Sequence, residues 1–219
     1  LFTGHPCQCA ALKSYLRARK ISQENLLVVD FLCHGGPSPQ IFEDFKELME
    51  KKYKGEIIDF KFRDKEKPRQ IPSCRGMRAL LLSTVPDTEL QKRKTAPDTE
   101  LQRNASSDTD LMDVFDETLN DRHFELFKRN YLSRECCYGC NYVGFEQRAG
   151  DISIADFWGC EKYYPEFFDK YGVSLILLNS DAGERYFKAI KDTGKTVEVE
   201  REKCLQASLK SAPKRPENY

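Results

Sequence analysis

The feature that most constrains the fold is a largely apolar run followed closely by a glycine turn. Residues 26–33 form the run, and Gly35-Gly36 with Pro37 form the turn. Strands that carry apolar residues on both faces are typical of parallel sheets covered by helices. We therefore expect a buried parallel strand over 26–33, with its carboxyl end at Cys33.

The segments on either side of this strand extend the pattern. Apolar residues recur at helical spacing over 12–16 and over 41–49, with Ser38 before Pro39 as a helix start. Residues 56–62 then alternate between apolar and polar, which is typical of a strand. This order of elements predicts an α/β fold, with a mixed, mainly parallel sheet flanked by helices, a cysteine-rich loop and a low-complexity insertion.

The insertion interrupts this pattern. Pro86-Asp87-Thr88-Glu89-Leu90-Gln91 recurs eleven residues later, among Lys, Arg, Asp and Thr residues that bury little surface. We interpret the stretch as a flexible insertion, with a partner-docking repeat as the alternative. Helical spacing returns over 111–132. The expected organisation is one α/β domain from 1–65 and 111–204, a flexible repeat-containing insertion at 66–110, and a tail at 205–219.

Composition excludes some classes of protein. Lys plus Arg and Asp plus Glu both number 35, so no excess positive charge favours nucleic acid. No apolar run approaches the roughly 20 residues of a membrane span. Nine cysteines in 219 residues favour metal or redox use in a reducing compartment, here the cytoplasm, over a disulfide scaffold. Because the chain opens at Leu1 without Met, we expect an N-terminal neighbour.

Two cysteines at close spacing are the strongest chemical signal. Cys137 and Cys140 are separated by two residues, so one turn brings both sulfurs to the same side of a metal centre. Cys7 at a helix N-terminus and Cys33 at a strand end are candidates for the remaining ligands. Zinc uses the same spacing, and Cys33 as a small buried apolar residue is an equally good interpretation at this point.

Several blocks of sequence resemble one family. They are Thr3-Gly4-His5-Pro6-Cys7-Gln8, residues 27–39 with Asp30, Cys33, His34, Gly35 and Pro37-Ser38, then Phe62-Arg63-Asp64-Lys65, Arg134 to Cys140, residues 151–159 ending in Asp156-Phe157-Trp158-Gly159, and Gly172-Val173-Ser174-Leu175. In this order they are similar to the C-terminal domain of the coenzyme F420 hydrogenase/dehydrogenase beta-subunit family. The similarity covers about 1–65 and 120–190.

The resemblance implies an iron–sulfur flavoprotein oxidoreductase. It implies a 4Fe-4S cluster held by Cys7, Cys33, Cys137 and Cys140 beside a flavin, usually FAD. Electrons would pass between the cluster and a hydride carrier. The implied partners are a redox protein or ferredoxin-like domain and a small-molecule electron acceptor. The other five cysteines fall outside the matching positions and are expected to be ordinary thiols: Cys9, Cys74, Cys136, Cys160 and Cys204.

Flavin contacts follow only from the same resemblance. Gly35 and Gly36 before Ser38 are candidates for a pyrophosphate site, with an ordinary turn as the alternative. Phe157 and Trp158 are candidates to flank a ring system, with core packing as the alternative. His34 is the candidate to relay a proton to a flavin nitrogen, or else a structural histidine.

The sequence also departs from the family pattern. His5 stands where threonine is usual, Glu135-Cys136 replaces Pro-Ser, and residues 66–118 do not resemble the expected strand region. Three hypotheses therefore remain. They are a cluster- and flavin-dependent oxidoreductase, a zinc-stabilised structural or interaction module, and a family member that has lost redox activity.

Overall fold

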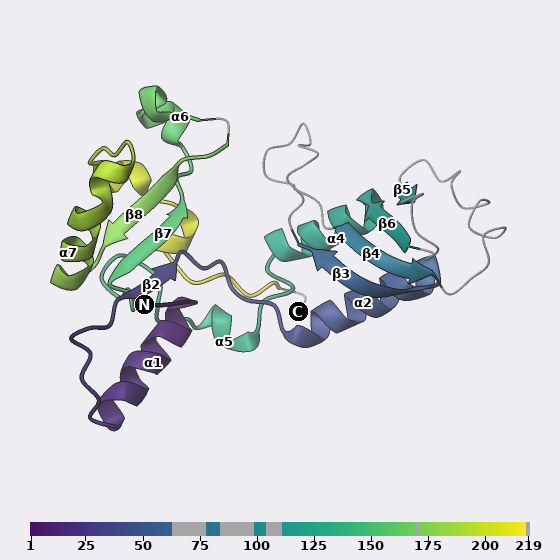
Figure 1. Cartoon of the computed structure of the whole chain (residues 1–219), viewed down its shortest axis with the longest axis horizontal. Coiled ribbons are helices and arrows are strands. Elements are labelled where there is room, and N and C mark those ends of the chain that lie inside the picture. Colours follow the sequence, from purple (N-terminus) through teal and green to yellow (C-terminus); the bar gives the residue numbers. More distant parts are fainter. Residues whose placement is uncertain (63–77, 84–98, 104–110, 170, 218–219) are drawn as a thin grey trace. The chain divides into compact units, whose positions relative to one another are not determined.

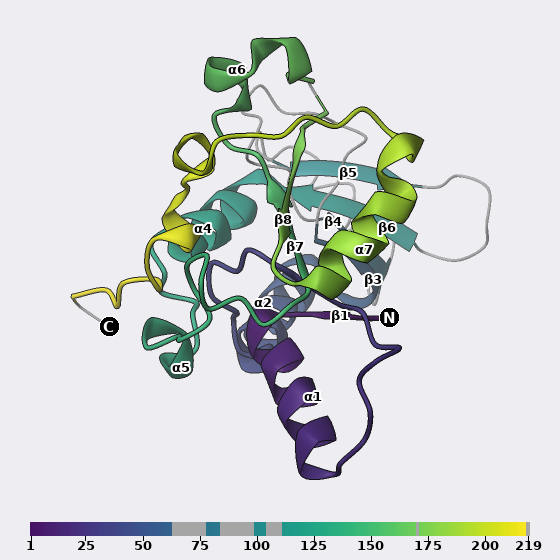
Figure 2. The ribbon, with the colours of Figure 1, turned by 90° about the vertical axis from the view of Figure 1, so that its left-hand side faces the viewer.

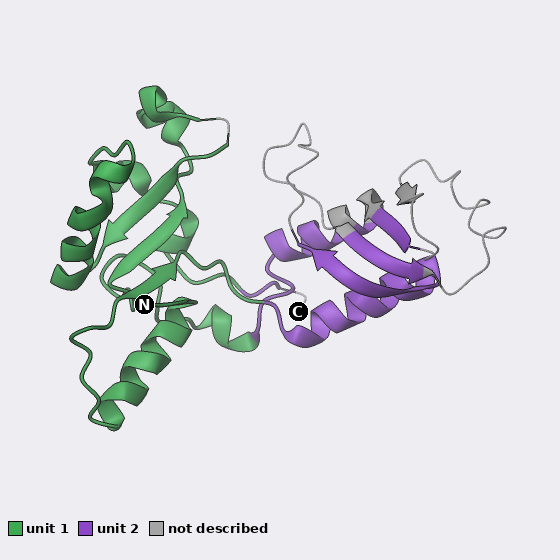
Figure 3. Ribbon diagram, viewed as in Figure 1, with its two compact units in different colours: residues 1–36, 135–214 green, residues 37–134, 215–219 purple. Residues whose placement is uncertain are grey.

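The computed structural model describes residues 1–62, 78–83, 99–103, 111–169 and 171–217. The chain forms two compact units (Figure 3). The first unit comprises Leu1–Gly36 and Glu135–Lys214, and the second comprises Pro37–Arg134 and Arg215–Tyr219. These boundaries differ from those of the expected domains, because residues 37–65 and 111–134 group with the second unit rather than with the first.

The first unit is built on a mixed sheet with the order β1-β2-β7-β8 (Figure 1). Its strands are β1 (Phe2–Gly4), β2 (Val28–Phe31), β7 (Ile152–Asp156) and β8 (Ser174–Leu178). β2 pairs in parallel with both β1 and β7, whereas β8 is antiparallel to β7. Val28 and Asp30 are fully buried. The α/β class and the buried parallel strand after residue 26 are therefore confirmed.

Two helices pack against this sheet (Figure 2). They are α1 (Pro6–Ala18), which contacts β1 and β2, and α7 (Asp181–Ile190), which contacts β8. Ser180 caps α7 by accepting a hydrogen bond from the Gly183 amide. Shorter helical segments complete the unit: α5 (Glu135–Tyr138), α6 (Cys160–Tyr163), η2 (Pro165–Phe167), η3 (Lys191–Thr193), η4 (Arg201–Cys204) and η5 (Ala207–Leu209).

The core of the first unit draws in residues from the expected tail. Its buried members are Leu32, Phe157, Cys160, Leu175, Cys204 and Leu209. The Gln206 side-chain amide donates to the Asp156 carbonyl at 3.0 Å. The beginning of the 205–219 segment is thus packed against the sheet, although its sequence shows no periodic apolar pattern.

The second unit is an antiparallel sheet with the order β3-β4-β6-β5. Its strands are β3 (Gly55–Lys61), β4 (Arg78–Ser83), β5 (Thr99–Arg103) and β6 (Leu111–Asp116), and its helices are α2 (Pro39–Tyr53) and α4 (Glu117–Lys128). Phe45, Met49 and Tyr53 of α2 share one apolar cluster with Leu81 and Val114 of the sheet. The unit therefore has an ordinary helix-on-sheet core.

The prediction of a helix over 111–132 is wrong for residues 111–116. Residues 111–116 form strand β6, in which Met112 and Val114 alternate into the core, and α4 begins only at Glu117. Pairing with β4 and β5 on both sides outweighs the apparent helical spacing.

Much of the expected insertion lies outside the described residues, including the first copy of its repeat at 86–91. Within 66–110 the described segments are strands β4 and β5, and the second repeat copy overlaps β5. Across the described ranges, every helix is too short or too polar to span a bilayer.

Candidate functional site

The four cysteines expected to bind a cluster all lie in the first unit. Cys7 is in the first turn of α1, and Cys33 follows β2 by two residues. Cys137 is in the short helix α5, and Cys140 comes two residues after that helix ends. Segments that are far apart in the sequence thus supply the four sulfurs, and Cys33 comes shortly after the end of the parallel strand β2.

Cys33 is close enough to the other three candidate thiols for their charge to act on it. Burial raises the pKa of the Cys33 thiol, and a hydrogen bond with the Gly35 backbone opposes the shift. Three neighbouring thiols raise this pKa further: Cys137, Cys7 and Cys140. Among the described residues, no three His, Cys, Asp or Glu side chains have the spacing of a single-ion site. Cys33 therefore lies within electrostatic reach of the other three candidate thiols.

Backbone amides point at two of these sulfurs. The Gly36 amide donates to Cys137 Sγ at 3.4 Å, and the Tyr142 amide donates to Cys140 Sγ at 3.5 Å. Gly35 adopts a positive φ of 98°, a conformation that favours glycine and turns the chain after Cys33. Donors of this kind stabilise thiolate and influence the reduction potential of a metal centre. The site thus contains hydrogen bonds that favour thiolate ligands.

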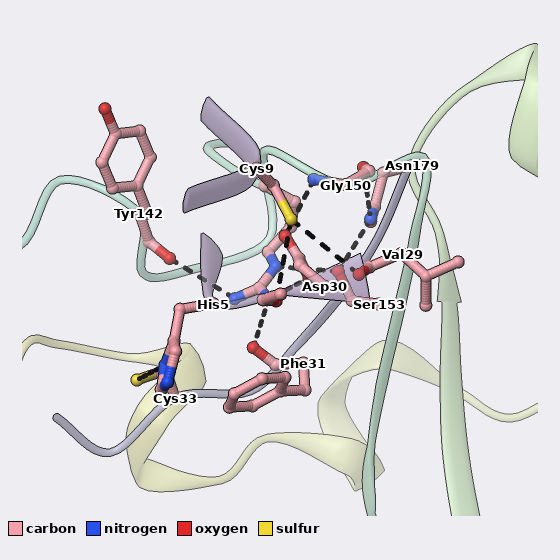
Figure 4. A network of polar contacts seen from close by, with 12 residues as sticks. His5, Cys9, Val29, Asp30, Phe31, Cys33, Tyr142, Gly150, Ser153 and Asn179 are labelled. Atoms are coloured by element: carbon pink, nitrogen blue, oxygen red, sulfur yellow. Dashed lines mark hydrogen bonds and ion pairs between the residues drawn. The ribbon is translucent and has the colours of Figure 1, made fainter. Parts of the chain in front are cut away.

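A buried ion pair holds the loop after Cys140 against strand β2 (Figure 4). The Arg148 guanidinium pairs with Asp30, and both side chains are almost fully buried. Arg148 also donates to the carbonyls of Phe31 at 3.0 Å and Tyr142 at 3.4 Å, while the Gly150 amide donates to Asp30 Oδ2 at 2.8 Å. Arg148 therefore connects the strand that leads to Cys33 with the loop that follows Cys140.

Two polar side chains complete this network, Ser153 in β7 and Asn179 directly after β8. Arg148 Nε donates to Ser153 Oγ at 2.9 Å, and Asn179 Nδ2 donates to the same oxygen at 2.8 Å. Gly150 is required here, because a Cβ at this position would lie 2.8 Å from the Asp30 amide nitrogen. Every strong donor and acceptor of the buried pair is thereby satisfied, as a buried charge requires.

A second carboxylate, Asp151, links the helices to the sheet. Its Oδ2 accepts from the Val28 amide at 2.8 Å, and its Oδ1 accepts from Lys13 Nζ and Ser180 Oγ, each at 3.0 Å. Lys13 belongs to α1 and Ser180 caps α7, so Asp151 fixes both helices relative to β2. The contact with Lys13 thus ties α1, whose first turn contains Cys7, to the sheet.

A pocket in the same unit is lined in part by Leu32 and His34, the sequence neighbours of Cys33. It has a volume of about 370 Å³, and its walls include Phe31, His34, Ile154, Trp158 and Gln206. The His34 and Trp158 rings are stacked, with centroids 5.2 Å apart and planes at 14°. Burial lowers the pKa of His34, while the Asp156 carboxylate opposes this shift. The pocket therefore offers flat aromatic walls with a few polar groups, a combination suited to a planar ligand.

Comparison with known protein families identifies the family of the chain. A family model described as the C terminus of the beta subunit of coenzyme F420 hydrogenase/dehydrogenase matches residues 1–203. The chain belongs to this family. The match continues through residues 66–118, where the sequence blocks had shown no similarity. No curated protein and no solved structure matches the chain.

Membership of the F420 hydrogenase/dehydrogenase beta-subunit family sets the chain among components of oxidoreductases. Against that background the expected flavin residues fall in different places. Trp158 and His34 line the pocket, and Gly35 and Gly36 form the turn after Cys33. Phe157 is instead buried in the core beside Tyr164, and Ser38 is the N-cap of α2 in the second unit. These flavin assignments remain predictions.

The remaining described cysteines have other surroundings. Cys9 is fully buried and donates to the Gly4 and Val29 carbonyls, and burial together with Asp30 raises its pKa to about 11. Cys160 and Cys204 belong to the core, and Cys136 is exposed. Cys74 lies outside the described residues.

Sequence reasoning missed the residues that hold the site together, above all Arg148 and Asp30. One signal was present, because Asp30 interrupts an otherwise apolar buried strand and a buried carboxylate needs a partner. Nothing in the local sequence identifies that partner, since Arg148 is 118 residues away.

Proposed function

We propose that this chain is the cluster-binding part of a flavin-dependent oxidoreductase, with Cys7, Cys33, Cys137 and Cys140 as ligands of a 4Fe-4S cluster. The observation that carries the proposal is that Cys33 lies within electrostatic reach of the other three thiols, all in one unit, with backbone amides donating to two of the sulfurs. Family membership supports the oxidoreductase context. When bound, the cluster would supply one-electron transfer, and a flavin would convert it to hydride chemistry.

The residues of this chain would contribute ligation, hydrogen bonding and placement of the loop that follows Cys140. Thiolates of the four cysteines would hold the metal, and the Gly36 and Tyr142 amides would stabilise their negative charge. The Asp30–Arg148 pair would keep the loop of Cys140 near Cys33.

We place the flavin, with FAD as the expected form, at the pocket beside Trp158. The stacked His34 and Trp158 rings and the apolar Phe31 and Ile154 side chains suit a planar ring system. Burial favours the neutral form of His34, which can hold a proton on one ring nitrogen and accept one on the other. On this proposal, His34 would exchange that proton with the ring system in the pocket.

Anaerobic purification tests the metal proposal. The expected product is a brown protein that contains iron and labile sulfide and is bleached by dithionite. Cys137→Ser and Cys140→Ser should lose iron, whereas Cys204→Ser, which removes a buried thiol from the core, should retain it. Equal iron content in all three variants would refute the ligand assignment. A colourless chain with one zinc would support the zinc-stabilised module instead.

Flavin binding is tested separately. Trp158→Ala should weaken the binding of added FAD, measured by quenching of flavin fluorescence, because it removes one wall of the pocket. Phe168→Ala is a matched control, since Phe168 is also an aromatic residue with 56 % exposure and does not line the pocket. Equal affinity in both variants would remove the pocket from the proposal. A chain with a cluster and no flavin affinity would favour a family member that has lost its flavin-dependent redox activity.

A further inference from the structure

A histidine side chain lies against the cysteine at the centre of the site. His5 Nδ1 is 3.4 Å from Cys33 Sγ, although the two residues belong to different segments, 28 positions apart (Figure 4). In the part of the chain that the structure describes, the other hydrogen bonds to the candidate ligand sulfurs involve backbone groups, among them the Gly36 and Tyr142 amides. His5 therefore brings a side-chain donor to a sulfur, and a single substitution can remove it.

Local contacts hold the His5 side chain in this position. Its ring packs against Phe31 of β2, with centroids 4.7 Å apart and planes tilted by 58°. Its backbone amide donates to Gln8 Oε1 at 2.9 Å, which fixes the residue as the N-cap of α1. The ring is therefore oriented by two elements of the first unit.

The direction of the hydrogen bond depends on the state of Cys33. A protonated thiol can donate to Nδ1, whereas a thiolate that binds metal carries no hydrogen and can only accept. When Cys33 is a ligand, the contact is favourable only if Nδ1 bears the hydrogen and Nε2 does not, or if both nitrogens bear one. A metal-bound Cys33 would therefore select an N–H donor at Nδ1.

We propose that His5 is a positioning residue that donates a hydrogen bond from Nδ1 to the Cys33 sulfur and thereby raises the reduction potential of the metal centre. This inference rests on the proposed function, since it requires Cys33 to be a ligand. Reduction adds negative charge to the centre and its sulfurs, so a donor stabilises the reduced form more than the oxidised form. Loss of the donor then lowers the potential.

Two substitutions at His5 separate the hydrogen bond from the size of the side chain. Asparagine carries an N–H donor the same number of bonds from the backbone as Nδ1, so His5→Asn should retain the contact. Threonine ends one bond earlier, so the hydroxyl of His5→Thr falls short of the sulfur. Both residues are suitable helix N-caps, so the start of α1 should remain intact.

The experiment uses the full chain, reconstituted anaerobically with iron and sulfide. Midpoint potentials are measured by dye-mediated titration of wild type, His5→Thr and His5→Asn. Tyr15→Thr is the control, since Tyr15 is an exposed aromatic residue on the same helix. Circular dichroism and iron content are recorded for every variant, so that a folding defect is recognised.

The expected result is a lower midpoint potential for His5→Thr, at unchanged iron content, with wild-type values for His5→Asn and Tyr15→Thr. Equal potentials in all four proteins would overturn the inference and leave the proposed function intact. Loss of iron from folded His5→Thr would also overturn it, because His5 would then be a ligand. A wild-type chain that binds no iron and sulfide would refute the proposed function itself.

Discussion

Both units of this chain have an apolar core, but among the described residues only the first unit also buries charged side chains. The second unit has an apolar core of Phe45, Met49, Tyr53, Ala79, Leu81, Met112 and Val114. The first unit buries Asp30, Asp151 and Ser153 beside its sheet, and it contains all eight cysteines that the structure describes.

This difference indicates where precise placement of side chains is needed. A buried ion pair contributes little net stability and is strongly destabilising when one partner is lost, whereas an apolar core stabilises without directional contacts. The polar network of the first unit connects the strand before Cys33 with the loop after Cys140. The second unit has no comparable network among its described residues, and its packing needs only apolar residues of suitable size.

The largest loss of stability should come from Arg148→Met, which breaks the buried ion pair of the first unit. Asp30 would keep the Gly150 amide as a donor and lose its charged partner, and breaking a buried pair from one side costs about 3–5 kcal/mol. Urea unfolding measures the loss. Trp158 is the one tryptophan of the chain and lies in the first unit, so its fluorescence reports on that unit.

A double variant keeps this prediction falsifiable. Asp30→Asn combined with Arg148→Met removes both charges and leaves an acceptor for the Gly150 amide, so it should be more stable than Arg148→Met alone. A loss below about 1 kcal/mol for Arg148→Met would mean that the pair does not hold the loop. The contrast between the units would then rest on the cysteines alone.

The Asp30–Arg148 pair also marks the limit of what local sequence predicts. The strand β2 and the four candidate cysteines were recognisable, because an apolar run, a glycine turn and a two-residue cysteine spacing are local patterns. The partner of Asp30 was not, since nothing local joins positions 118 apart. Strand β6 was mistaken for helix because a short apolar segment satisfies both periods until its neighbours are known.

The next largest loss of stability should come from a substitution in the apolar core of the second unit. Leu81 is fully buried in the apolar core, and Leu81→Ala should cost about 2–5 kcal/mol through the lost contacts and the cavity. The loss should appear in far-ultraviolet circular dichroism, with a smaller change in the midpoint of Trp158 fluorescence and unchanged iron content. Loss of iron from folded Leu81→Ala would show that the cysteine site depends on the apolar core of the second unit.

A smaller effect is expected at the cap of α7. Ser180 Oγ accepts from the Gly183 amide at 3.2 Å and donates to Asp151 at 3.0 Å. Ser180→Ala should therefore destabilise the first unit by about 1 kcal/mol, the usual cost of losing an N-cap. Ser180→Thr keeps the hydroxyl and serves as the control. Equal midpoints of Trp158 fluorescence for the two variants would mean that the cap and its bond to Asp151 contribute nothing measurable.

The smallest effect should come from a second arginine that contacts the loop of Arg148. Arg201 pairs with Glu146 at 2.8 Å, and its guanidinium lies 4.2 Å from the centroid of the Phe145 ring. The side chains of this pair are 54 % and 80 % exposed, so Arg201→Ala should cost less than about 1 kcal/mol. The loss should also shrink in about 0.5 M salt, whereas that of Arg148→Met should not.

Arg201 and Arg148 both join this loop to another part of the first unit through a carboxylate, and they differ mainly in burial. If burial decides their importance, the two arginines should differ severalfold in the stability they lose and only Arg148 should affect iron content. Similar losses at both positions would contradict this view. They would indicate that the loop is held by many small contacts rather than by one buried pair.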